Sequence, residues 1–494
     1  MKKNILLFMV TFTVSTFLLA TNNVSSLQGS GTDLDPFKIG TVEELIFFRT
    51  QVNDSVPSYM TASYELTSAL DLQNESWVAI GNVLNRPFKG KFNGKGNKLT
   101  NLKIGSSTTK TNVTYASLFG AIENASISNL KMEGVALYNS PLAGSSFNSL
   151  IISQAKMSTI TNCHATGSID SEGNLAACFA GGIASQMTGS TIINCSANVD
   201  IKLRGTTEAA QIACGGIAGQ LIYNVVDGTE YYCNVYNSYS TGSINTASPT
   251  STFMYGGGIG GNQNRAHIAN CYSSVSIVGV CNGSTAGKSF VGGISGANAQ
   301  ASTLSYCLAL NNNLKSCSTG AATTTRYVGR ISGNKAATAT LSDNYAKTME
   351  LKLGADEASA TVYNAVAGAT TKDGVDLGVN IATELLNGFV TSIVSYAGVN
   401  FKSWEVKEGV NNGNPIFKEV ASAVNDIDAA TIMRAYASNG VVTVLNIEAG
   451  SVIAIYGISG ALISQKSVAG NRLDIALPKG VYFVKGIRNL IVNQ

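Results

Sequence analysis

The chain has 494 residues, enough for two or three ordinary domains or for one long repeat array with caps. Only 13% of the residues are charged, 45% are hydrophobic and 51 are Gly, which excludes a disordered chain and suits many short strands joined by tight turns. The formal net charge of +3, without any run rich in Lys and Arg, argues against nucleic acid as a partner.

The first twenty residues follow the pattern of a secretory signal peptide. Lys2 and Lys3 precede an apolar stretch from Ile5 to Leu19, and the small residue Ala20 comes before a polar segment. This pattern predicts that residues 1–20 are a signal peptide cleaved near Ala20. No run of about 18 apolar residues occurs later in the chain, so the sequence predicts no membrane span. We therefore expect an exported protein at the cell surface or outside the cell.

A helix is predicted over residues 41–52. Thr41 is a suitable N-cap, and Glu43 and Glu44 fall in the first turn, where the helix dipole favours acidic side chains. Because this helix directly precedes the repeats, we expect it to cover the open end of the array.

The middle of the chain repeats itself. A small-residue turn followed by Ile recurs in GGIASQ, GGIAGQ, GGIGGN, GGISGA and VGRISGN, and the central residues of these motifs are Ile183, Ile217, Ile259, Ile294 and Ile331. A second motif lies between the turns, as TITNCHATGSI at 159–169, TIINCSANVDI at 191–201, YYCNVYNSYSTGSI at 231–244 and IANCYSSVSI at 268–277. A repeat of about 36 residues indicates a solenoid in which each unit buries its apolar face against its neighbours.

The repeats alternate aliphatic residues with Ser, Thr and Asn, which predicts strands. We therefore predict an all-β protein whose residues 88–345 form one right-handed parallel β-helix with the five Ile residues pointing inward. Each repeat is expected to hold roughly two coils, which would place equivalent positions about 10 Å apart.

A different pattern begins near residue 430. Residues 347–420 look irregular, whereas VVTVLNI, SVIAIYGISG and LDIALPKGVYFVKG alternate apolar and polar residues between turns. This pattern predicts a separate small β-sandwich at 430–494, joined by a flexible link from Val424 to Met433.

These motifs carry a family resemblance. GGIGGNQNRAHIANCYSSVSI at 257–277 resembles the GLUG repeats of bacterial surface proteins, and similar segments occur at 77–104, 116–135 and 403–417. The resemblance implies a GLUG-type β-helix over residues 21–420, with the cap helix at one end and a closing segment at the other. GLUG modules also occur beside immunoglobulin A peptidases whose chemistry needs HExxH, but the only two histidines, His164 and His267, lie outside any such motif.

Residues 430–494 resemble the C-terminal sorting domains of type IX secretion clients in Bacteroidota, in IYGISGALI and LPKGVYFVKG. The chain ends in RNLIVNQ, where those domains carry a Lys-rich strand. The resemblance therefore leaves open a sorting role or an ordinary accessory domain.

An enzyme on a β-helix that cleaves polysaccharides needs paired carboxylates, or carboxylates that hold Ca²⁺ beside a basic residue. Residues 231–342 contain neither Asp nor Glu. Asp170 and Glu172 could share a strand face, whereas Asp200, Glu208, Asp227 and Glu230 are isolated in the sequence. We therefore predict no catalytic residues and no enzyme activity, and keep a lyase or glycoside hydrolase as the alternative.

Other motifs favour structural interpretations. GGGIGG at 256–261 fits a dinucleotide fingerprint and NGSTAGKS at 282–289 nearly fits a P-loop, but no helix is expected after either. Nine cysteines without CxxC or paired His indicate buried thiols; a bridge within one repeat, between Cys271 and Cys281 or between Cys307 and Cys317, stays open. The sequence predicts no metal and no cofactor site.

Tyrosines are frequent in the array and could stack on sugar rings, or could simply pack along the strands. They include Tyr232, Tyr236, Tyr239, Tyr255, Tyr272 and Tyr306. The sequence therefore favours an adhesin-like binding or structural protein whose partner is a host or microbial glycan or a surface protein. It leaves the oligomeric state open.

Overall fold

The computed structural model describes residues 24–493 with gaps at 74, 84, 143, 174–176, 206–210, 249–252, 282–286, 319–325, 380, 398–399, 420–433, 439–440, 446, 448, 458–460 and 485–489. The predicted signal peptide and the predicted link from Val424 to Met433 lie outside the described residues. The chain divides into two compact units, residues 1–418 and 419–494.

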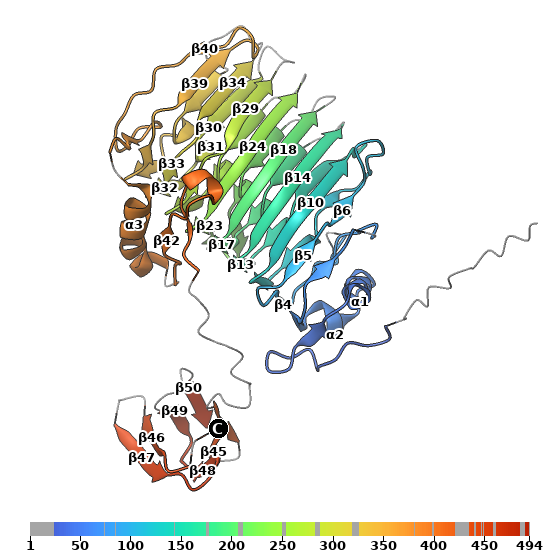
Figure 1. Ribbon diagram of the computed structural model, residues 1–494, viewed down its shortest axis with the longest axis vertical. Helices are drawn as coiled ribbons and strands as arrows, with labels where there is room; N and C mark the ends of the chain where they lie inside the picture. The colour runs from blue at the N-terminus through green and yellow to red at the C-terminus, as the bar shows by residue number, and fades with distance from the viewer. Residues whose placement is uncertain are drawn as a thin grey trace, which may run out of the picture. The chain divides into compact units, whose positions relative to one another are not determined.

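The first unit is a parallel β-solenoid of about eight turns, which confirms the predicted fold class (Figure 1). A complete coil passes through four sheets, which we name A, B, D and C in the order in which the chain meets them, while the first strands, β1 to β6, belong to sheets A and B alone. Neighbouring coils pair in parallel through these sheets, so the chain advances by one strand spacing, about 4.8 Å, per coil.

Sheets A and B carry the two successive strands on either side of one corner. Sheet A contains β1 (Phe37–Ile39), β2 (Ser63–Leu66), β4 (Lys91–Asn93), β9 (Ser126–Ser128), β13 (Thr159–Thr161), β17 (Thr191–Ile193), β23 (Cys233–Tyr236), β27 (Ala266–Ala269), β32 (Thr303–Ser305) and β37 (Thr340–Ser342). Sheet B contains β3 (Leu70–Asp71), β5 (Lys98–Thr100), β6 (Lys103–Ile104), β10 (Lys131–Asn139), β14 (His164–Gly173), β18 (Ser196–Gly205), β24 (Tyr239–Ser248), β28 (Tyr272–Ser273), β29 (Ser276–Cys281), β33 (Leu308–Ala309), β34 (Asn313–Ser318), β38 (Tyr345–Ala346), β39 (Glu350–Gly354), β40 (Thr361–Val362) and β41 (Val375–Asp376).

Sheets D and C have seven strands each and meet at the Gly-Gly-Ile turn. Sheet D contains β7 (Tyr115–Ala116), β11 (Ser145–Ser149), β15 (Ala177–Gly181), β19 (Gln211–Gly215), β25 (Phe253–Gly257), β30 (Lys288–Gly292) and β35 (Arg326–Gly329). Sheet C contains β8 (Phe119–Glu123), β12 (Ile152–Lys156), β16 (Ala184–Thr188), β20 (Ala218–Ile222), β26 (Gly260–Asn264), β31 (Ser295–Ala299) and β36 (Ser332–Lys335).

The five repeated Ile residues point into the solenoid, as predicted. Ile183, Ile217, Ile259, Ile294 and Ile331 are all fully buried in one continuous core. They belong to consecutive coils, since the N–H of each donates to the carbonyl of the next, as from Ile183 to Ile217 over 2.9 Å. The expectation of two coils per repeat is therefore wrong, because four strands and their corners use the whole repeat for a single coil.

The corner between sheets A and B is held by a ladder of stacked amides. Asn162, Asn194 and Asn237 adopt left-handed backbone angles, with φ of 55°, 54° and 45°, a conformation that Asn tolerates better than most residues. Nδ2 of each donates to Oδ1 of the Asn in the preceding coil, over 3.3 Å from Asn194 to Asn162 and 2.7 Å from Asn237 to Asn194. The Asn of the repeated motif thus supplies both the left-handed backbone angle and the hydrogen bond between coils at this corner.

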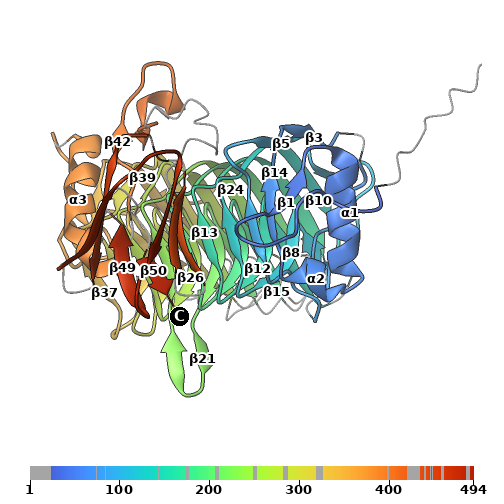
Figure 2. The same cartoon turned by 90° about the horizontal axis from the view of Figure 1, so that it is seen from below.

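The N-terminal helix closes one end of the core. Helix α1 (Val42–Asn53) begins after the N-cap Thr41, and Thr41 and Glu44 form a reciprocal capping box. Leu45, Phe48 and Val52 are fully buried in the solenoid core, which confirms the predicted cap (Figure 2). A short helix, α2 (Pro57–Met60), follows.

The segment after the repeats is more ordered than the sequence indicated. Residues 347–420 were expected to be irregular, yet they include helix α3 (Ala382–Ala397) and the antiparallel pair β42 (Trp404–Glu405) and β43 (Ile416–Phe417), with the 3-10 turn η2 (Asn411–Gly413) between them. This segment packs on apolar side chains of the solenoid's outer surface, such as Tyr272 and Leu308, and those contacts are invisible in the local sequence.

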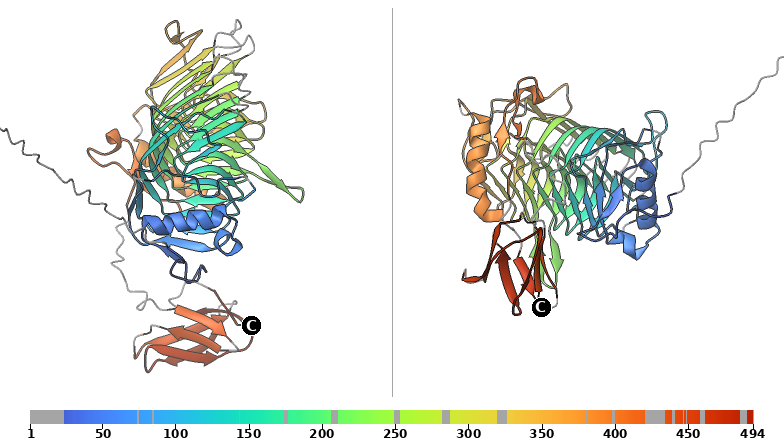
Figure 3. Two further views of the ribbon diagram at one scale, coloured as in Figure 1. Left: turned by 90° about the vertical axis from the view of Figure 1, so that its right-hand side faces the viewer. Right: turned by 60° about the horizontal axis from the view of Figure 1, so that its bottom comes forward.

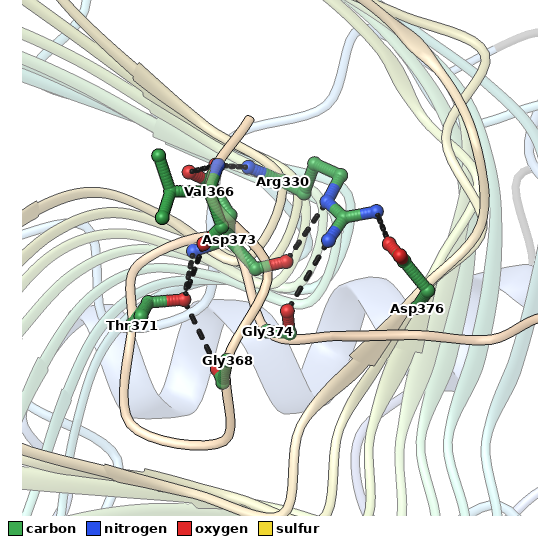
Figure 4. A network of polar contacts seen from close by, with 7 residues as sticks. All are labelled: Arg330, Val366, Gly368, Thr371, Asp373, Gly374 and Asp376. Atoms are coloured by element: carbon green, nitrogen blue, oxygen red, sulfur yellow. Dashed lines mark hydrogen bonds and ion pairs between the residues drawn. The ribbon is translucent and has the colours of Figure 1, made fainter. Parts of the chain in front are cut away.

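Arg330 closes the other end of the core. In the preceding coil the equivalent residue is Gly293, where a Cβ atom would lie 2.0 Å from the carbonyl oxygen of Arg330. The next chain segment beyond Arg330 is a loop. Arg330 Nε donates to the carbonyl of Asp373 over 2.9 Å, Nη2 to that of Gly374 over 3.2 Å, and the guanidinium pairs with Asp376 (Figure 4). Glycine is therefore needed only where another coil follows.

A hairpin inserted between two strands of the solenoid explains the longest spacing between repeats, the one from Ile217 to Ile259. Strands β21 (Asn224–Val226) and β22 (Thr229–Tyr231) pair antiparallel, and Asp227 and Gly228 turn the chain with φ of 50° and 78°. The hairpin projects from the side of the solenoid (Figures 2 and 3).

The second unit has two antiparallel sheets around a small core. One sheet contains β44 (Arg434–Ser438), β45 (Val441–Leu445) and β48 (Arg472–Ala476); the other contains β46 (Val452–Gly457), β47 (Leu462–Ser467), β49 (Gly480–Val484) and β50 (Leu490–Asn493). Val442, Val444 and Ile475 from the first sheet and Ile455 and Val484 from the second are buried together. This arrangement is the predicted small β-sandwich.

Candidate functional site

The longest strands of the solenoid present a row of polar side chains on the outer face of sheet B. Strands β14, β18 and β24 have ten residues each, and their alternate residues point outward. We define the polar face as Ser168, Asp170, Glu172, Asn198, Asp200, Lys202, Arg204, Ser243 and Asn245. The register aligns Asp170 with Lys202 and Asn245, and Ser168 with Asp200 and Ser243.

Asp170 and Glu172 lie on the same face of β14, as the sequence indicated. Both pair with Lys110, whose Nζ lies 2.8 Å from Oδ1 of Asp170 and 3.2 Å from Oε1 of Glu172. The Lys110 side chain is only 16% exposed, so this ammonium lies close against the strand. Arg204 Nη1 approaches Asp170 to 3.8 Å. The two carboxylates therefore form ion pairs with one largely buried lysine.

The rest of the polar face offers both hydrogen-bond donors and acceptors. Asp200 accepts a hydrogen bond from the Ser243 hydroxyl over 2.6 Å, while Lys202, Arg204 and Asn245 are exposed. Charges of both signs thus alternate with hydroxyl and amide groups across three coils. Such a surface can bind a ligand that carries several polar groups at successive positions.

The carboxylates of this face were named from the sequence, but Lys110, Lys202 and Arg204 were not. The alternation of charged and apolar residues in SANVDIKLRG did contain a signal for the last two. Lys110 gave none, because it reaches Asp170 from sixty residues away in the chain.

A serine and a histidine lie side by side where strands β14 and β18 of sheet B begin. His164 Nδ1 lies 2.7 Å from the Ser196 hydroxyl oxygen, and burial lowers the pKa of His164, so the imidazole is neutral at pH 7. Ser196 is only 3% exposed. The contact stabilises adjacent coils and does not present a nucleophile at the surface.

Four of the six tyrosines considered for glycan stacking are used to dock the chain's own closing segment. Tyr239 and Tyr272 stack at 5.0 Å between ring centroids and lie beneath Trp404, at 5.8 and 5.6 Å. Tyr236 contacts Phe401 and Tyr306 contacts Phe389. These rings are therefore not a glycan platform.

The remaining two tyrosines have neighbours on the solenoid itself. Tyr255 stacks on Phe290 along sheet D, and Tyr232 packs against His267 at the base of the hairpin. Packing along strands, the plainer of the two sequence interpretations, accounts for Tyr255.

All nine cysteines are buried free thiols, as the sequence favoured. GGGIGG at 256–261 is the corner between β25 and β26, and strand β30 begins at Lys288, where a P-loop needs a helix. Within the described residues, no group of three His, Cys, Asp or Glu side chains could hold a metal ion. No helix in this part of the chain is long and apolar enough to cross a membrane.

Comparison with solved structures finds the same fold elsewhere. A crystal structure from Bacteroides ovatus, provisionally described as an immunoglobulin A1 protease, aligns with a TM-score of 0.50 and 20% identity over 79% of this chain and 94% of that one. A second structure, described as an IgA1 protease, gives a TM-score of 0.44 and 15% identity, and the chain spans about a quarter of its length. No family model matches. No curated protein matches.

The first of these structures overturns one expectation. The sequence predicted that the chain is not an enzyme, partly because a β-helix without paired carboxylates lacks the usual catalytic groups. A protein of the same fold is nevertheless described as a protease. The prediction of no enzyme activity is therefore withdrawn.

Proposed function

We propose that the chain is an exported binding protein, adhesin-like in function, whose solenoid presents the polar face to a glycan or a glycosylated surface protein. The observation that carries this proposal is the in-register row of Asp170, Lys202 and Asn245 beside the row of Ser168, Asp200 and Ser243. Successive strands place these groups about 4.8 Å apart, so an extended polymer could contact one polar side chain of each row in every coil.

The sequence supports export and surface attachment. Residues 1–20 have the pattern of a signal peptide, residues 21–420 resemble GLUG repeats, and residues 430–494 resemble a type IX sorting domain. We propose this organisation together with the binding function, since GLUG-type arrays occur in bacterial surface proteins.

A second candidate function, cleavage of a polysaccharide, is favoured by Asp170 and Glu172. Both carboxylates share Lys110, and paired carboxylates beside a base are the groups that glycoside hydrolases and polysaccharide lyases use. This candidate uses the same face as the first, so one set of variants tests both.

The test is a glycan and mucin panel probed with the purified protein, with reducing-sugar release measured in parallel. Replacing Lys202 and Arg204 by Glu reverses two exposed charges of the polar face and should abolish glycan capture. Lys335→Glu, at another exposed lysine, at the end of β36, should leave capture unchanged. Equal binding by all three proteins would refute the proposed surface.

Asp170→Asn with Glu172→Gln separates the two functions. Sugar release by the unaltered protein that these substitutions abolish would establish cleavage as the function of this face. Capture without release supports the binding function.

A further inference from the structure

A separate groove lies on the outer face of sheet A, over the first coils. Its volume is about 580 Å³, within the range of sites for small ligands, roughly 300–1,000 Å³. Its floor is one outward column of four side chains from successive strands, in which Ser63 pairs with Lys91, Lys91 with Ser126, and Ser126 with Thr159.

The charges in this groove are balanced. Lys91 Nζ lies 2.5 Å from Oδ2 of Asp33, and the Ser63 hydroxyl donates to the other carboxylate oxygen of Asp33 over 2.6 Å. Lys89, in the groove wall, pairs with Glu123 at 3.1 Å. An anionic ligand would have to displace Asp33 from Lys91. A neutral ligand can instead form hydrogen bonds with the groups of Asp33 and Lys91 that stay free in their ion pair.

Met157 gives the groove one apolar wall at an unusual backbone position. Its φ is 48°, in the left-handed region that long side chains rarely adopt. In the next coil the same corner is Gly189, and a Cβ atom there would lie 2.8 Å from Sδ of Met157. Left-handed angles recur at this corner in other coils, as at Asn124 and Ala301, so the backbone conformation belongs to the repeat and the Met side chain is what distinguishes this coil.

We infer that this groove binds a short neutral oligosaccharide. Hydroxyl groups of Ser126 and Thr159 and the exposed amide of Asn124 can exchange hydrogen bonds with sugar hydroxyls, while Met157 covers the apolar face of a sugar ring. The groove lies on sheet A and shares no residue with the polar face on sheet B, so it goes beyond the function proposed above.

Isothermal titration of the purified protein with cellotetraose, maltotetraose, mannotetraose and chitotetraose tests this inference. We expect at least one of them to bind. The variant Met157→Gly removes the apolar wall and relieves the backbone strain, so its affinity should fall about fivefold or more while its melting temperature stays equal or rises. Ala301→Gly is the matched control, because Ala301 has φ of 49° at the equivalent corner of a later coil outside the groove, and should bind like the unaltered protein.

Two results would overturn the inference. One is that none of the four tetrasaccharides binds at millimolar concentration, whether or not a sulfated heparin tetrasaccharide, titrated in parallel, binds. The other is that Met157→Gly and Ala301→Gly bind equally well. The double variant with Lys202 and Arg204 replaced by Glu should keep full affinity for the neutral tetrasaccharide, which distinguishes failure of the groove from failure of the polar face.

Discussion

The backbone N–H of Cys163 donates a hydrogen bond to Sγ of Cys195, directly above it in the next coil, over 3.4 Å. At the same corner the N–H of Cys195 donates to the Ser238 hydroxyl over 3.1 Å, and that of Cys307 to the Asn344 side chain over 3.0 Å. The thiol thus occupies a position where a hydroxyl or an amide oxygen serves equally well. Cys195 therefore accepts a buried N–H from the previous coil.

The first prediction concerns this acceptor. Cys195→Ala leaves the Cys163 N–H without a partner in a dry core and should cost about 1–3 kcal/mol of unfolding free energy. Cys195→Ser keeps an acceptor and should cost clearly less. Urea unfolding of both variants measures the difference, and equal losses would show that the sulfur contributes only volume.

The second prediction is a pH dependence from Cys233. Burial raises the pKa of this thiol to about 12, above the usual value of about 8.5 that it should have in the unfolded chain. Its contribution to stability is complete below pH 8.5 and is lost as the pH rises toward 12, because the unfolded thiol then ionises and the folded one does not. Ser190 occupies the same corner one coil earlier, so Cys233→Ser should fit.

Denaturant unfolding at pH 8, 9 and 10 checks this difference. Between pH 9 and 10 the unaltered protein should lose about 1 kcal/mol more than Cys233→Ser. Parallel pH profiles for the two proteins would contradict the prediction. Other buried groups that titrate in this range, such as Tyr255, are common to both and cancel.

The third prediction concerns the terminal cap at Arg330. Arg330→Ala removes the side-chain partners of the Asp373 and Gly374 carbonyls, and should cost about 3 kcal/mol. The loss should begin at the last coil, so amide hydrogen exchange should accelerate first in β35 and β36. Lys335→Ala, on the same coil but exposed, is the control and should change neither quantity.

The fourth prediction is that the hairpin is dispensable for folding. In the preceding coil the single residue Gly189 makes the turn for which this coil uses residues 223–232. Replacing that segment by one glycine should therefore leave the unfolding free energy within about 1 kcal/mol, since Val225, Val226 and Tyr231 are exposed and add nothing to the core. A collapse of the melting transition would mean that the pairing of Arg265 with Glu230 at the hairpin base is structural.

Much of the candidate site could not be predicted from the sequence. The alternation around Asp170 and Glu172 correctly placed both on one strand face, because side-chain direction in a strand depends on local geometry alone. Their partner Lys110 depends on the path of a distant loop. The sequence left open whether the tyrosines bind a glycan or pack along the strands for a similar reason, since the segment that covers Tyr239 and Tyr272 lies more than a hundred residues further along the chain.

The sequence by itself determined the repeat, the inward positions of Ile183 and its four equivalents, and the capped helix after Thr41, because periodicity and capping act over a few residues. Only the tertiary structure decided that each repeat is one coil, which stacks Cys163 directly on Cys195. It also decided that Arg330, at the position of a repeated glycine, caps the solenoid. Both outcomes depend on which backbone lies one strand spacing away, and that neighbour is a full coil distant in the sequence.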